Sequence, residues 1–320
     1  MSAAHHETHL EAYVVQKLAE QGWKVGTSDG YDADYAMYPE DIEAWIKATQ
    51  PRKWDKLAVM QGAKARKTLM DRLETALDKN GTIEVLRRGF GMAGLAQIDM
   101  SEAAPEDRRN EDVLHRYGAN ILRVVPQLKY HPGRELAIDL GFFVNGLPFA
   151  TVELKTDFTQ SVDAAMRQYK DDRRPVDPAT GRKHPLLTFK RGAVVHFAMS
   201  DSEIWMTTKL AGENTFFLPF NQGRDGRAGN PAREDGEYPV AYFWEKICQP
   251  DAFMRIVHNF VYVEKKNVVD LKGNWSVKET LIFPRYHQLD AVNAMISDAR
   301  ENGPGHAYLC EHSAGSGKTS

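Results

Sequence analysis

Residues 137–155 read AIDLGFFVNGLPFATVELK, two apolar segments on either side of an Asn-Gly pair. Apolar segments that flank Asn-Gly are a strong signal for a β-hairpin. Three charged residues, Asp139, Glu153 and Lys155, interrupt the apolar pattern. The stretch therefore predicts a largely buried hairpin whose charges need an explanation.

Two registers of this hairpin compete, and a slip of one residue turns every side chain to the other face. Two sets of apolar residues each share one face of a strand: Ile138, Leu140, Phe142 and Val144, and Ala150, Val152 and Leu154. Joining these faces pairs Leu140 with Val152 and leaves a three-residue loop at 145–147. The same register sets Asp139 opposite Glu153, with Lys155 two residues further along the same face.

Directly opposed carboxylates repel each other, which costs stability unless a cation lies between them. Two carboxylates and a nearby main-chain carbonyl suit Mg²⁺, whose bound water can become a hydroxide nucleophile. Lys155 would orient that water or stabilise charge on a phosphorane-like transition state. The alternative is a solvated strand face with three ordinary charges. The pattern Glu-x-Lys alone is not specific, since residues 264–266 (EKK) also match it without a comparable upstream hairpin.

The composition bounds the class of protein. The chain has 320 residues, of which 42% are hydrophobic and 27% charged, as in a soluble globular protein of two domains. No apolar run approaches the roughly 18 residues of a membrane span, and the N-terminus does not resemble a secretory signal. With only two cysteines, we expect a cytoplasmic protein without disulfides. The formal charge of −3 means that any contact with a polyanion must be local.

The apolar spacing predicts the α/β class. Helices are expected at 7–21, 39–49, 55–79 and 159–172, and strands at 82–90, 119–130, the opening hairpin, 192–200, 202–210 and 215–220. Two short helices at 240–247 and 251–261 follow. The core order is αβββαβ, a mixed sheet flanked by helices. We expect a first domain at 1–263, a polar linker at 264–279, and the start of a second domain at 280–320.

An Asp on one strand, Glu-x-Lys on the next and a following helix resemble the PD-(D/E)xK nuclease core. More closely, DLGFFVNGLPFATVELK resembles the N-terminal region of the restriction (R) subunit of type I restriction-modification enzymes. The resemblance extends from the first helix through TQPRKWDKL to FPRYHQLDAV and the Gly-rich end. It implies that Asp139 and Glu153 are metal ligands and Lys155 the catalytic lysine. Gln168 falls where the family often has Gln-x-x-x-Tyr, although Asp172 replaces that Tyr here.

The resemblance also implies an activity and partners. It implies Mg²⁺-dependent endonucleolytic cleavage of double-stranded DNA, after ATP-driven translocation by a complex with methyltransferase and specificity subunits. Glu7 or Glu11 of the first helix would add a further acid, or each is an exposed helix charge. The histidines of HHETH, residues 5–9, do not have the spacing of the zinc-protease motif H-E-x-x-H.

The C-terminal residues 307–320, AYLCEHSAGSGKTS, read as a strand that enters a phosphate-binding turn. Gly315 and Gly317 would form the turn, Lys318 would reach the phosphates of ATP and Thr319 would bind Mg²⁺. The turn resembles the first motif of superfamily 2 helicases. RYHQLDAV resembles their glutamine motif and makes Gln288 a candidate adenine contact, or a helix-surface amide. Because the chain ends at residue 320, before an acidic hydrolysis motif, we expect a fragment of a larger motor that does not hydrolyse ATP.

Positive charge is concentrated after the hairpin, where residues 160–192 contain eight Lys or Arg and four Asp. Six of these bases would contact phosphates or form a solvated face: Arg167, Lys170, Arg173, Arg174, Arg182 and Lys183. The leading hypothesis is the nuclease. A non-catalytic DNA-binding or docking module is the first alternative, and a nucleotide-binding fragment is the second.

Overall fold

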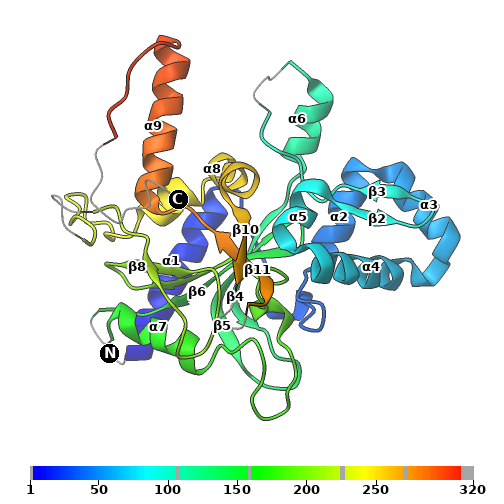
Figure 1. The fold of residues 1–320 in the computed structure, drawn as a ribbon, viewed down its shortest axis with the longest axis horizontal. Coiled ribbons are helices and arrows are strands. Elements are labelled where there is room, and N and C mark those ends of the chain that lie inside the picture. The colour runs from blue at the N-terminus through cyan, green and yellow to red at the C-terminus, as the bar shows by residue number, and fades with distance from the viewer. Residues whose placement is uncertain (1–2, 106–108, 158–159, 224–227, 270–272, 311–320) are drawn as a thin grey trace.

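A seven-stranded mixed sheet with helices on both faces forms the centre of the protein (Figure 1). The computed structural model describes residues 3–105, 109–157, 160–223, 228–269 and 273–310. The strands lie in the order β1-β4-β5-β6-β7-β8-β9: β1 (Lys24–Val25), β4 (Leu122–Lys129), β5 (Ala137–Val144), β6 (Leu147–Leu154), β7 (Val195–Met199), β8 (Ile204–Thr207) and β9 (Leu218–Pro219). β4, β5 and β6 are antiparallel, whereas β7 runs parallel to β6. The expected mixed α/β architecture is confirmed.

The helices account for most of the N-terminal region. Their bounds are α1 (Ala3–Glu20), α2 (Pro39–Thr49), α3 (Pro51–Gln61), α4 (Ala65–Asn80), α5 (Thr82–Arg88), α6 (Glu111–Gly118), α7 (Val162–Asp171), α8 (Pro250–Arg255) and α9 (Tyr286–Asn302). The helices predicted at 7–21, 39–49 and 159–172 are confirmed. The helix expected at 55–79 is divided between α3 and α4, because Gly62 has a φ of +53°, outside the helical region.

The strand expected at residues 82–90 is wrong, since helix α5 occupies most of it. Thr82, Ile83, Val85 and Leu86 are buried, a spacing that fits one face of a short helix. Glycines with positive φ bound the helix on both sides, at +86° for residue 81 and +65° for residue 89. A small hairpin of β2 (Phe90–Met92) and β3 (Ala96–Ile98) follows. Short apolar segments do not distinguish helix from strand by periodicity alone.

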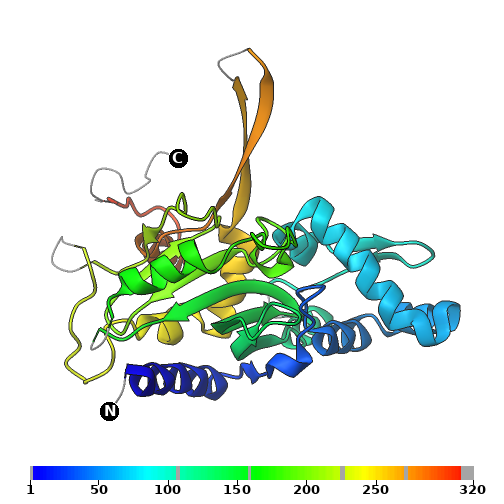
Figure 2. The same ribbon diagram turned by 90° about the horizontal axis from the view of Figure 1, so that it is seen from below.

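The segment expected as a polar linker is a two-stranded antiparallel ribbon of β10 (Tyr262–Val269) and β11 (Trp275–Ile282). The ribbon projects from the body of the protein (Figure 2). Its cross-strand pair Lys265–Glu279 has a nitrogen–oxygen distance of 3.2 Å, so the charges that suggested a linker pair across the strands. The two short helices expected before it are present: the first is the π-helical segment Phe243–Ile247, and the second is α8 continued by the π-helical segment Ile256–Phe260.

The register of the central hairpin is confirmed, because Leu140 pairs with Val152. Its loop has two residues rather than the predicted three, since Val144 pairs with Leu147. Both turn residues have positive φ, +48° for Asn145 and +83° for Gly146, as a tight hairpin turn requires. A register shift beside Phe142 accommodates the extra residue of β6, so a tight turn and a continuous apolar face coexist.

The sheet separates two hydrophobic cores, one towards α1 and one towards α7, which lie on opposite faces (Figure 2). The core on the α1 side contains most of the predicted apolar face: Leu140, Phe142, Val144, Ala150, Val152 and Leu154. Ile138 instead joins Leu128 in the core on the α7 side. Between these parts of the β4–β5 ladder lies Gln127, whose φ of +47° interrupts the regular strand.

Candidate active site

The charged residues of the hairpin gather where β5 and β6 separate. The β5–β6 ladder ends at the pair Leu140–Val152. Beyond it, the main-chain N–H of Leu154 donates to Oδ2 of Asp139 at 2.6 Å. On the β5 side, Nη2 of Arg173 donates to the carbonyl of Ala137 at 2.7 Å. Side chains thus replace strand pairing here, and we call this region the fork (residues 137–139 and 153–155 with Arg173).

Glu153 lies at the centre of the fork and is fully buried. Its Oε1 accepts a hydrogen bond from Nε of Arg173 at 2.5 Å. Its Oε2 is buried and has no hydrogen-bond partner in the part of the chain that the structure describes. Burial, together with the charge of Asp139, raises the pKa of Glu153 to about 8, although Arg173 and Lys155 act to lower it. Glu153 is therefore a buried acid with one oxygen available for a further ligand.

Asp139 connects the fork to helix α1 through Gln127. The β4–β5 ladder omits the position where Gln127 faces Asp139. The Gln127 side-chain amide donates to Glu11 of α1 and lies 3.5 Å from Oδ1 of Asp139. Burial is the main reason that the pKa of Glu11 is raised to about 7. The hydrogen bond from Gln127 lowers this pKa, and the charge of Asp139 makes a smaller contribution that raises it. Gln127 has a positive φ although it is not glycine, and residues with such strained backbone conformations often occur at functional sites.

Lys155 follows β6 and turns towards α1. Its main-chain N–H donates to the carbonyl of Met199, and its Nζ lies 3.3 Å from Oε2 of Glu7. The side chain is only 12% exposed. Lys155 also lowers the pKa of Glu153 through its charge. Helix α1 therefore supplies the two acids, Glu7 and Glu11, that were considered from the sequence.

The structure thus brings together the three charges of the hairpin, but not all of the other candidates. Gln168 is half-buried near the end of α7, and its carbonyl accepts from the N–H groups of Asp172 and Arg173. None of the hydrogen bonds found among the described residues joins the Gln168 side chain to the acids of the fork. These two main-chain hydrogen bonds lie at the C-terminal end of α7, and the role of the Gln168 side chain stays a prediction.

Arg173 was expected either to contact phosphates or to belong to a solvated face, and both interpretations are wrong for it because its side chain is only 8% exposed and is paired with Glu153. Arg167, Arg174, Arg182 and Lys183 are exposed, and Lys170 is half-buried. Sequence reasoning missed Gln127 and the pairing of Arg173. No local pattern marks either residue, because each meets its partner only after the chain has folded.

The residues proposed for nucleotide binding lie at the other end of the chain. Oε1 of Gln288 accepts from the N–H of Arg285 at 2.9 Å, so this amide caps helix α9. Gly315, Gly317, Lys318 and Thr319 lie outside the described residues. The structure therefore gives no geometry for the phosphate-binding turn.

The fork is a two-carboxylate centre rather than a compact cluster of three acids. Within the described ranges, no three carboxylate, imidazole or thiol groups of the fork have donor atoms all within 4.8 Å of one another. Two carboxylates suffice for Mg²⁺, which keeps several of its waters. The unpartnered Oε2 of Glu153 is an oxygen donor of the kind that such an ion takes as a ligand.

The fold and the fork together define a mixed α/β domain with an acidic centre at the separated ends of two strands. The family model for the type I restriction enzyme R protein N terminus matches residues 5–215. The chain belongs to this family. The matched range includes α1, the fork and α7. The family implies DNA and a restriction complex as partners. Among curated proteins, no sequence matches the chain. In the part of the chain that the structure describes, no helix is both long enough and apolar enough to span a membrane.

Proposed function

We propose that the fork is a nuclease active site that hydrolyses DNA phosphodiester bonds with Mg²⁺, as part of an ATP-driven type I restriction complex. The observation that carries the proposal is the buried Oε2 of Glu153, which has no hydrogen-bond partner among the described residues. An unpartnered buried carboxylate oxygen is costly, and a cation relieves that cost. Membership of the restriction family supports the same reading.

Asp139 and Glu153 would hold the ion, Glu153 through its unpartnered Oε2 and Asp139 through Oδ1, which the Gln127 amide approaches only to 3.5 Å. Oδ2 of Asp139 and Oε1 of Glu153 are engaged by Leu154 and Arg173. When bound, Mg²⁺ supplies charge neutralisation and activation of a water molecule. Glu153 must be ionised to bind it, and the guanidinium of Arg173 beside Glu153 favours that form.

Two further groups suit the chemistry of phosphodiester hydrolysis. Lys155, held 3.3 Å from Glu7, places an ammonium group where it stabilises negative charge that develops on the phosphate. Glu11, whose pKa is raised to about 7, exchanges a proton readily near neutral pH. Glu11 belongs to α1, and Lys155 lies on the side of the fork that faces this helix. Gln168 has no part in this proposal.

The remaining proposal concerns the C-terminal residues and rests on sequence alone. GSGKT at 315–319 and Gln288 would begin an ATP-binding motor related to superfamily 2 helicases. The methyltransferase and specificity subunits would supply target recognition. Binding of ATP to the chain, compared with its Lys318→Ala variant, tests this proposal separately from the nuclease.

The nuclease proposal is tested by metal binding and by nicking of supercoiled plasmid DNA, with Mg²⁺ and Mn²⁺ each present alone. Glu153→Ala removes the central ligand. Glu264→Ala alters the second Glu-x-Lys, whose acid is partly exposed on β10, and serves as the matched control. We expect Glu153→Ala to abolish metal binding at the fork and to reduce nicking by roughly 100-fold or more, as loss of a central catalytic group does. Glu264→Ala should change neither.

Metal binding is the deciding measurement because it does not require the other subunits. Metal uptake and nicking that persist unchanged in Glu153→Ala would overturn the nuclease proposal. Salt-dependent DNA binding without metal uptake would favour the docking module instead, since phosphate contacts alone produce that dependence.

A further inference from the structure

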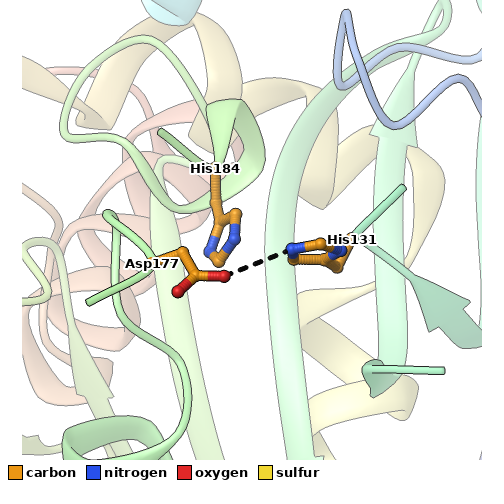
Figure 3. A group of neighbouring side chains, drawn as sticks. All are labelled: His131, Asp177 and His184. Atoms are coloured by element: carbon orange, nitrogen blue, oxygen red, sulfur yellow. Dashed lines mark ion pairs between the residues drawn. The ribbon is translucent and has the colours of Figure 1, made fainter. Parts of the chain in front are cut away.

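A second group of metal-binding side chains lies away from the fork, on the loop that follows α7. His131 lies two residues after the end of β4, while Asp177 and His184 lie on the loop between α7 and β7. Figure 3 shows the three side chains converging. Their donor atoms all lie within 4.8 Å of one another, and all three residues are at most 8% exposed. Asp177 and His184 lie 46 and 53 positions after His131, so no sequence motif joins the three.

The hydrogen bonds of the loop leave the relevant atoms free. Oδ1 of Asp177 accepts from the N–H groups of Ala179 and Thr180 at 2.8 and 3.3 Å, which closes a turn. Nδ1 of His184 lies 2.8 Å from the carbonyl of Arg174, so this nitrogen carries the proton and donates. The carbonyl thereby fixes the tautomer in which Nε2 of His184 has a lone pair.

Those remaining atoms are buried without hydrogen bonds among the described residues. They are Nε2 of His184, Oδ2 of Asp177 and both ring nitrogens of His131. Oδ2 of Asp177 has only ionic neighbours, at 3.5 Å from Nε2 of His131 and 3.2 Å from Nη1 of Arg134. Four buried polar atoms without hydrogen bonds in one place are unusual, because most such atoms in proteins have partners.

We infer that His131, Asp177 and His184 form a binding site for a divalent transition-metal ion, with Zn²⁺ the natural occupant. Two imidazoles and a carboxylate are ligands that suit Zn²⁺ rather than Mg²⁺. Ligands about 2 Å from a tetrahedral ion lie roughly 3.4 Å from each other, close to the observed 3.5 Å between His131 and Asp177. The widest separation between donor atoms, at most 4.8 Å, must shorten by up to about 1.4 Å. Arg134 is half-exposed and can turn into solvent when the ion neutralises Asp177.

The burial of the cluster supports this assignment. Burial lowers the pKa of His184, and the N–H of Ala179 is the largest of several contributions that lower the pKa of Asp177. His184 is therefore neutral and Asp177 ionised near pH 7, the protonation states that metal ligands need.

The ion would act as a staple between β4 and the loop at residues 173–184. This loop begins with Arg173, which pairs with Glu153 of the fork. It also carries the exposed bases Arg174, Arg182 and Lys183. Closing the loop on β4 limits its freedom and holds these groups in place. The site is distinct from the fork and its occupancy does not depend on whether the fork cleaves DNA.

The experiment measures binding of Zn²⁺ and of Co²⁺, whose visible absorption reports tetrahedral coordination, to the full chain. All proteins carry His5→Ala, His6→Ala and His9→Ala, because the HHETH segment offers imidazoles of its own. His184→Ala and His131→Ala each remove one ligand. Asp177→Asn keeps Oδ1 for the turn and removes the anionic ligand, so it separates metal binding from folding of the loop. His115→Ala, on exposed α6, and Glu264→Ala, on β10, are the controls.

We expect one equivalent of ion with a tetrahedral Co²⁺ spectrum in the parent and both controls. In the three site variants its affinity should fall by at least ~100-fold, more than the 10- to 100-fold typical of a lost outer-shell partner. Zn²⁺ should also slow tryptic cleavage at Arg182 and Lys183 in the parent but not in Asp177→Asn. Equal binding in parent and site variants, or none in the parent, would overturn the assignment in favour of a simple His131–Asp177 ion pair.

Discussion

The pattern Glu-x-Lys occurs twice in the chain, at the end of β6 and within the β10–β11 ribbon. The two copies differ in the burial of their side chains and in the residues with which they pair. In the ribbon, Glu264 and Lys266 pair with each other at 3.0 Å, and their side chains are 28% and 66% exposed. On β6, Glu153 is fully buried and Lys155 nearly so. Neither pairs with the other: Glu153 binds Arg173 and Lys155 binds Glu7.

The difference shows what separates a candidate catalytic pair from an ordinary surface pair. Residues i and i+2 of a strand share a face, so two long exposed side chains of opposite charge can form an ion pair. Such an exposed pair changes the free energy of unfolding only slightly. On β6, burial removes the two charges from water, which destabilises the folded state unless each charge is paired. Partners from distant segments, Arg173 for Glu153 and Glu7 for Lys155, provide this pairing. The tripeptide is the same kind of pattern in both places, and the long-range partners are what distinguish them.

The largest predicted contrast between the two copies is in the pH dependence of stability. The pKa of Glu153 is raised from an ordinary value of 4.5 to about 8 in the folded chain. The folded state therefore holds this proton more tightly than the unfolded state, so its contribution to stability is present below pH 4.5 and is lost as pH rises towards 8. At about 1.4 kcal/mol per pH unit, the loss is on the order of 4 kcal/mol.

Urea unfolding from pH 5 to 8 checks this contrast. Relative to Glu153→Gln, which cannot ionise, the parent chain should lose stability as pH rises. Glu264→Gln should follow the parent at every pH, since the ribbon acid is partly exposed. A constant difference between the parent and Glu153→Gln across the range would mean that Glu153 does not titrate there.

The next largest effect concerns Arg173, the partner that the ribbon copy does not have. Arg173→Met leaves the buried Glu153 without its cation, and breaking a buried pair costs about 3 to 5 kcal/mol. Because Glu153 can take up a proton, we expect about 3 kcal/mol at pH 8 and less at pH 5. Arg174→Met, one residue later and exposed, should cost less than about 0.5 kcal/mol. Equal costs for the two variants at pH 8 would contradict the importance of the pair.

The comparison also shows which parts of the site were accessible to sequence reasoning. The Leu140–Val152 register followed from apolar alternation, because only one register buries both apolar faces. Asp139, Glu153 and Lys155 could be grouped from that register alone. The pairing of Arg173 with Glu153 could not be predicted, because a helix and 20 positions separate the two residues.

Other differences have equally specific causes. The bulge beside Phe142 has no strong local signal, so the turn length was wrong although the register was right. The ribbon was mistaken for a linker because its strands are charged, yet those charges pair across the strands, as Lys265 and Glu279 do. The convergence of His131, Asp177 and His184 left no trace in the spacing of the sequence. Sequence patterns thus predicted the register of the central hairpin, whose strands are apolar, and missed both the charged ribbon and the contacts that loops bring together.

The smallest effect contrasts the glycines in the turns of the two hairpins. Gly146 and Gly273 both have a φ of +83°, so alanine is strained at either position by about 1 kcal/mol. A Cβ on Gly146 would also lie 2.5 Å from the carbonyl oxygen of Tyr38 and 2.6 Å from Cγ1 of Ile42, whereas a Cβ on Gly273 has no atom of the described residues within 4 Å. We expect Gly146→Ala to cost about 2 kcal/mol more than Gly273→Ala, because the buried turn must shift to relieve this overlap. Urea unfolding of the two variants measures the difference. Equal costs would contradict the prediction, because they would mean that a Cβ at Gly146 does not overlap Tyr38 and Ile42.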